Sequence, residues 1–74
     1  MKIRLQGTGW HEASPVRELK IGDIIEWNFG YTSEVLKLTP TKTGKQITVT
    51  MRSHDTGNIN DRRMGADRLV VIKK

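Results

Sequence analysis

Arginine and lysine side chains in the second half of the sequence are the residues best suited to contact a ligand. The 74 residues have a formal net charge of +5 at pH 7. Residues 1–37 hold five basic and five acidic residues, whereas residues 38–74 hold eight basic and three acidic ones. Because arginine and lysine neutralise phosphates, a charge excess confined to one half of a chain favours a polyanionic partner. The candidate phosphate contacts are Lys42, Lys45, Arg52, Arg62, Arg63 and Arg68.

These side chains bind one ligand together only if the local structure brings them to one surface. Gln46–Arg52 alternates apolar and polar residues, which predicts a strand with Arg52 on its outward face. A turn then leads into a weaker strand, Ile59–Arg63, and Arg62 also faces outward if Ile59 points inward. Arg52 and Arg62 would then lie nearly opposite each other on one polar sheet face. The alternative is a solvated surface on which the arginines pair with Asp55, Asp61 and Asp67.

A second group of candidate residues is aromatic. Trp27, Phe29 and Tyr31 lie within five residues of one another, an unusual density for a segment that also contains Gly30. Exposed rings stack on nucleobases or anchor a protein partner, whereas buried rings would only fill the core. We expect Tyr31 to be exposed, because it follows Gly30 at the end of a strand. The positions of Trp27 and Phe29, in the core or on the surface, stay open.

Residues for catalysis or metal binding form no complete motif. His11-Glu12 begins like the metal-binding sequence HExxH, but Pro15 occupies the position of the second histidine. His54 would have to approach His11 in space to rescue a metal site. Ser14 is better explained as a helix cap than as a nucleophile. The chain has no cysteine. We therefore expect no catalytic residues, no metal site, no cofactor and no enzymatic activity.

The elements that must position these residues are short strands. Alternating or β-branched runs, separated by turn residues at a spacing of about 8–12 residues, predict an antiparallel all-β fold. The predicted strands are Lys2–Gln6, Ile24–Phe29, Val35–Leu38, Gln46–Arg52, Ile59–Arg63 and Leu69–Ile72. The side chains expected inside are Ile25, Trp27, Ile47, Val49, Leu69 and Val71.

The connections between these strands also carry expectations. Trp10–Ser14 is predicted to be a loop, with Trp10 folded back onto the core. Ser14–Leu19 is predicted to form one helical turn that Ser14 caps, since Pro15 suits the first helical position. Met64–Arg68 is expected to be a tight turn or a single 3₁₀ turn.

Four segments together resemble the strands of small SH3-like barrels over residues 16–72. They are Leu19-Lys20-Ile21-Gly22-Asp23-Ile24-Ile25, Glu34-Val35-Leu36-Lys37-Leu38, Ile47-Thr48-Val49 and Asp67-Arg68-Leu69-Val70. The resemblance implies a single small antiparallel SH3-like barrel domain over residues 1–74, with five to six short strands and at most one helical turn. The paired tyrosines, acidic loop and Trp-Trp step of peptide-binding SH3 domains are missing, so we expect no proline-rich ligand.

These observations favour a non-enzymatic protein that binds nucleic acid through its basic face, with phosphate contacts and Tyr31 as a stacking residue. The short, basic sequence is also similar in style to small accessory proteins of bacteriophages. The alternative function is therefore a protein-interaction module that binds an acidic surface of a host complex. No apolar run approaches the ~20 residues that span a bilayer, and the N-terminus lacks the apolar block of a signal peptide. We expect a cytoplasmic protein without a membrane partner.

Overall fold

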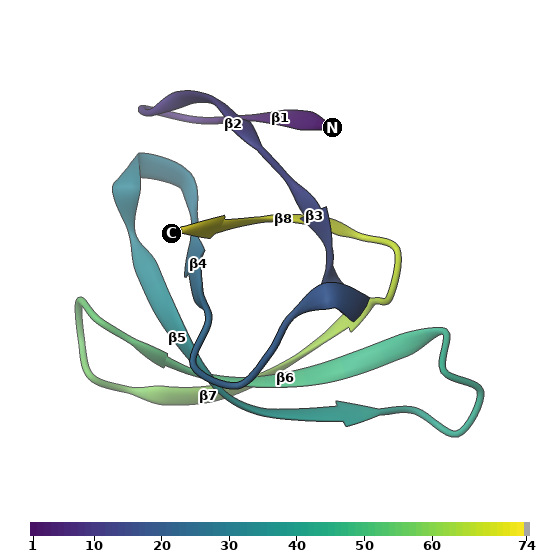
Figure 1. The fold of residues 1–74 in the computed structure, drawn as a ribbon. Helices are drawn as coiled ribbons and strands as arrows, with labels where there is room; N and C mark the ends of the chain where they lie inside the picture. Colours follow the sequence, from purple (N-terminus) through teal and green to yellow (C-terminus); the bar gives the residue numbers. More distant parts are fainter. Residues whose placement is uncertain (74) are drawn as a thin grey trace.

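The computed structural model describes residues 1–73 as an antiparallel all-β fold with two 3₁₀ turns (Figure 1). The 3₁₀ turns are η1, Val16–Glu18, and η2, Asn28–Gly30. The strands within residues 1–73 are β1 (Lys2–Leu5), β2 (Gly9–Glu12), β3 (Ser14–Pro15), β4 (Ile24–Glu26), β5 (Thr32–Pro40), β6 (Gln46–Ser53), β7 (Ile59–Gly65) and β8 (Leu69–Lys73).

The strands form a hairpin and one larger sheet. Strands β1 and β2 pair only with each other, and the larger sheet has the order β3-β8-β4-β5-β6-β7. Strands β5, β6 and β7 make a curved layer, and the β1–β2 hairpin lies beyond β8 on the other side of the molecule (Figure 1). The register of β5 on β6 shifts between Val35 and Lys37. Such a bulge bends a strand and increases its twist, in keeping with this curvature.

The core lies between the curved layer and β8. The alternation predicted for Gln46–Arg52 is confirmed, because Ile47, Val49 and Met51 are buried while Arg52 is exposed. The buried members of the main core cluster are Val16, Leu19, Ile25, Val35, Ile47, Val49, Met51, Met64 and Val70.

Strand β8 is buried on both of its faces. Val70 belongs to the main core, and its neighbour Val71 is also buried, with only 4% of its surface exposed. Successive side chains of a strand point to opposite faces, so Val71 faces the side on which the β1–β2 hairpin lies. The expectation that Leu69 and Trp27 lie inside is met only in part, because both are half-buried, and of the two Trp27 packs against the main core cluster. A strand covered on both faces has no apolar alternation from which its inner face can be read.

Two predicted connections are strands instead. Gly9–Glu12 is not a loop but strand β2, since Gly7 and Gly9 adopt positive φ angles of 82° and 89° and reverse the chain. Trp10 is therefore 69% exposed rather than folded onto the core. Ser14 does not cap a helical turn, because Ser14–Pro15 pairs with β8 as strand β3.

The helical turns also differ from the expectation of at most one. The first, η1, lies within the predicted segment Ser14–Leu19. The second, η2, replaces the end of the predicted strand Ile24–Phe29. The tight turn predicted at Met64–Arg68 is confirmed in a shorter form, because β7 continues to Gly65 and the Arg68 N–H donates to the Gly65 carbonyl at 3.0 Å. Neither turn within residues 1–73 is long and apolar enough to cross a membrane.

A matched pair of isoleucine substitutions tests the assignment of inner and outer faces. Ile25 is fully buried, whereas Ile59 is 57% exposed. Ile25→Ala should lower the free energy of unfolding by about 2–5 kcal/mol, because it leaves a cavity in the core. Ile59→Ala should change it by less than about 0.5 kcal/mol. Urea unfolding followed by circular dichroism measures both, and equal losses would contradict the assignment.

Candidate functional site

The aromatic segment leaves the sheet where β4 ends. The backbone N–H of Trp27 donates to the Tyr31 carbonyl at 2.7 Å. This bond closes the chain into the turn η2, so the strand does not extend to Phe29. Phe29 adopts the left-handed conformation, with φ 62° and ψ 19°. This conformation costs a residue with a Cβ atom about 1–2 kcal/mol. The predicted strand Ile24–Phe29 is therefore wrong beyond Glu26.

Contacts with the β1–β2 hairpin hold η2 in this conformation. The Phe29 N–H donates to the Gln6 carbonyl at 2.6 Å, and the Gln6 N–H donates to Oδ1 of Asn28 at 2.9 Å. Gly7 lies directly against Phe29, since a Cβ atom at position 7 would be 2.9 Å from Cδ1 of that ring. Two segments more than 20 residues apart are thus joined by reciprocal hydrogen bonds.

The turn exposes two of its aromatic rings and anchors the third. Phe29 is 65% exposed and Tyr31 is 53% exposed, so the expectation for Tyr31 is confirmed. The Trp27 ring is half-buried, and its indole N–H donates to Oγ of the buried Ser33 at 3.1 Å. The segment therefore carries a fixed indole beside two exposed rings.

These rings line an open hollow of about 620 Å³, which we call the aromatic hollow. Two of the predicted phosphate contacts, Arg62 and Arg68, line it together with the predicted stacking residue Tyr31. Asp61 is the only acidic residue of the lining, and its side chain lies on the outer face of β7, opposite Thr50. The full lining is Trp27, Asn28, Phe29, Tyr31, Ser33, Met51, Asn60, Asp61, Arg62 and Arg68.

Arg62 reaches the hollow because it lies on the inner face of β7. It pairs with Val49 in the register of β6 and β7, and its guanidinium carbon lies 5.2 Å from the centroid of the Trp27 ring. This is the range of a cation–π contact. Arg52 pairs with Ile59 on the outer face. The predicted pairing of Arg52 with Arg62 is therefore wrong, because Ile59 points outward and every side chain of β7 follows that register.

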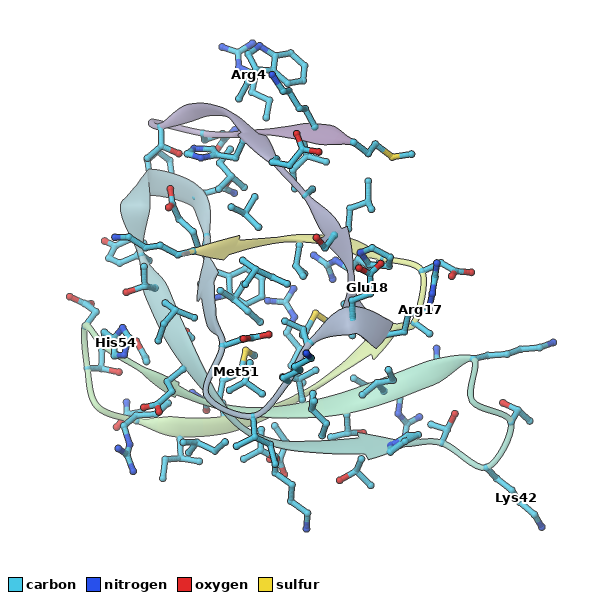
Figure 2. All side chains as sticks on the ribbon, in the orientation of Figure 1. Arg4, Arg17, Glu18, Lys42, Met51 and His54 are labelled. Atoms are coloured by element: carbon cyan, nitrogen blue, oxygen red, sulfur yellow. The ribbon has the colours of Figure 1, made fainter. Side chains whose placement is uncertain are left out.

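The other predicted phosphate contacts lie outside the hollow. Arg52 has Glu34 beside it on β5, and Arg63 lies further along the same outer face, beside β6. Lys42 and Lys45 lie in the β5–β6 turn, which projects away from the rest of the molecule (Figure 2). The six basic residues thus belong to three regions: the aromatic hollow, the outer sheet face and the β5–β6 turn.

Acidic neighbours do not neutralise these residues as the alternative required. Asp67 forms its ion pair with Arg17, and Asp61 accepts a hydrogen bond from the Thr50 hydroxyl at 2.7 Å. Within the part of the chain that the structure describes, no ion pair involves any of the six candidate phosphate contacts. Their cationic groups are therefore not engaged with carboxylates of residues 1–73.

The two histidines have separate surroundings. Nε2 of His11 lies 2.9 Å from Oγ1 of Thr8 and 3.5 Å from Oε2 of Glu26. His54 instead places its Nδ1 2.8 Å from Oγ1 of Thr32. Across residues 1–73, no three His, Asp or Glu side chains are arranged to hold a metal ion.

Comparisons with models of protein families, with curated proteins and with solved structures find no match. The function of this chain must therefore be inferred from the residues of the aromatic hollow and their geometry.

Two asparagines of the hollow were not among the predicted contacts, although Asn60 was expected on the same strand face as Arg62. Asn28 fixes the turn through its Oδ1 atom, and Asn60 lies on the inner face of β7, opposite Met51. The first had a readable signal, since asparagine followed two residues later by Gly30 is typical of a turn. The inner position of Asn60 could not be predicted from a local pattern, because it depends on the register of β7.

Two glycine substitutions test whether the hairpin positions the aromatic turn. Gly7 and Gly9 both have positive φ, but only Gly7 lies against Phe29, and a Cβ atom at position 9 would meet nothing within 4 Å. Both Gly7→Ala and Gly9→Ala should pay the backbone cost of about 1–2 kcal/mol. Gly7→Ala should destabilise the protein further and shift the NMR signals of the Phe29 ring. Equal losses of stability, with the Phe29 signals unmoved, would show that the turn does not depend on this contact.

Proposed function

We propose that this chain is a non-enzymatic nucleic-acid-binding protein, with phosphates contacting the arginines of the aromatic hollow. The observation that carries the proposal is the presence of Arg62 and Arg68 in one hollow with the exposed rings of Phe29 and Tyr31. Nucleic acids offer both complementary groups, because their phosphates are anionic and their bases are flat.

The electrostatics of the hollow support an anionic ligand. Arg62 and Arg68 line the hollow, whereas the carboxylate of its one acidic lining residue, Asp61, is bonded to Thr50 on the outer face. The whole chain has a formal net charge of +5. A guanidinium group donates in its own plane and matches the oxygens of a phosphate. Because the Arg62 guanidinium stacks against Trp27, its position is restricted before a ligand arrives, which lowers the entropic cost of binding.

The remaining basic residues have a different role in this proposal. Arg52, Arg63, Lys42 and Lys45 lie outside the hollow and are exposed. Exposed charges attract a polyanion over a distance of about 10 Å at 0.1 M salt, without a fixed contact. They would raise the rate of association and hold a longer strand that extends beyond the hollow.

The proposal also includes assignment of the larger sheet to the SH3-like barrels. The order β8-β4-β5-β6-β7 supports it, since the last strand returns to pair with the first strand of a four-strand meander. One feature departs from these barrels: a single 3₁₀ turn before the last strand is typical of them, whereas here the connection between β7 and β8 is a tight turn.

A protein-interaction module is the second candidate function. The observation that favours it is the exposure of Trp10, at 69%, and of Ile59, at 57%, both outside the aromatic hollow. Tryptophan is enriched among the residues that dominate the energy of protein interfaces. In that case the basic surface would contact an acidic protein.

Salt-dependent binding of a fluorescent oligonucleotide of random sequence tests the first candidate. Each phosphate contact contributes about 0.7 to the slope of log affinity against log salt for a single strand, and about 0.9 for a duplex. Arg62→Ala and Arg68→Ala should each weaken binding and reduce the slope by about that amount. Fluorescence anisotropy at several salt concentrations measures both quantities.

Arg4→Ala is the matched control for these variants. Arg4 is exposed on the β1–β2 hairpin and points away from the rest of the protein (Figure 2). Its removal should leave the slope unchanged. Absence of binding at low salt would refute the proposed function, and an equal loss in Arg4→Ala would refute the role of the hollow.

A further inference from the structure

The aromatic hollow presents ring faces, which a flat phosphate-binding surface does not need. Phe29 and Tyr31 leave more than half of their surfaces exposed, although each would stabilise the protein by packing inside. Phe29 is also held in a left-handed conformation that costs about 1–2 kcal/mol. The structure therefore keeps these rings accessible at an energetic cost, and phosphate binding alone does not account for that.

Ring faces discriminate between the forms of a nucleic acid. In a duplex each base is stacked between its neighbours, so its faces are reachable only after unpairing, which costs a few kcal/mol. An unpaired base has free faces that stack on aromatic side chains. A concave hollow lined by exposed rings thus favours unpaired bases over a paired helix.

We propose that the aromatic hollow binds an unpaired nucleobase together with its adjacent phosphates, so that the protein selects single-stranded over duplex nucleic acid. This inference rests on the proposed function and names the form of ligand that the same site takes. The volume of about 620 Å³ lies within the range of pockets that hold small organic ligands, and it accommodates a base with its sugar.

The residues of the hollow divide into a stacking group and a polar group. Phe29 and Tyr31 provide open faces for the base. Arg62 and Arg68 provide donors for the phosphates on either side of it. Trp27 forms a fixed wall, because Ser33 holds its N–H and Arg62 covers its ring.

The hollow offers few hydrogen-bonding groups to the edge of a bound base. Oδ1 of Asn28 already accepts one hydrogen bond from the Gln6 backbone, so this side chain offers a ligand its NH₂ group and one further acceptor position. The amide of Asn60 also lines the hollow. Stacking tolerates all four bases. The hollow should therefore bind single strands with little dependence on sequence.

Tryptophan fluorescence can report directly on the hollow. The chain has two tryptophans, and Trp10→Ala leaves Trp27 as the only one. The same substitution removes an exposed ring outside the hollow and serves as the aromatic control. Three probes of equal length are titrated at low salt: a mixed-sequence single strand, its duplex, and an abasic strand that keeps the phosphates.

The single strand should quench Trp27 and bind more tightly than the other two probes. Tyr31→Leu should weaken its binding by roughly 5- to 150-fold, the loss expected for one stacked base, whereas Tyr31→Phe should retain it. Trp10→Ala alone should match the unmodified protein in anisotropy. Circular dichroism confirms that each variant is folded.

The outcomes separate this inference from the proposed function. If the duplex and the abasic strand bind as tightly as the single strand and Trp27 is not quenched, the inference fails while nucleic-acid binding stands. Equal binding by Tyr31→Leu and Tyr31→Phe would also overturn it. If none of the three probes binds at low salt, both the inference and the proposed function fail.

Discussion

A single turn, held in place by a distant hairpin, determines what the surface of this protein offers a ligand. Phe29 adopts a left-handed conformation that costs about 1–2 kcal/mol. Three hydrogen bonds of η2, two of them with Gln6, offset this cost, since each contributes about 0.5–1.5 kcal/mol. With these bonds the chain turns away from β4, and Phe29 lines the aromatic hollow together with residues of β7.

The β1–β2 hairpin therefore has two roles that depend on each other. A two-stranded hairpin is marginally stable alone, and here it covers the face of β8 on which Val71 lies. The same hairpin carries Gln6 and Gly7, which hold the aromatic turn. Loss of hairpin packing would change the aromatic hollow as well as the stability of the fold.

The fold class and the central strand could be predicted from the sequence, because β6 has one buried and one exposed face and alternates accordingly. The strand predicted at Ile59–Arg63 is also present, within β7, but its inner face could not be predicted. Both faces of β7 are largely polar, and an inward or outward Ile59 suits the pattern equally well. That one ambiguity placed Arg62, and Asn60 with it, on the wrong face. The charge distribution of the sequence indicated Arg62 and Arg68 as ligand contacts. Their position beside Phe29 depends on contacts between η2 and the hairpin, and no local sequence pattern predicts those contacts.

The central claim is that the ligand contacts the inner side of the sheet, between the aromatic turn and β7. The most direct test is a map of backbone amide NMR shifts during titration with a single-stranded oligonucleotide. The largest changes should fall on residues 28–31, residues 60–62 and Arg68. Changes confined to Arg52 and Arg63 on the outer face, or to the β5–β6 turn with Lys42 and Lys45, would contradict it.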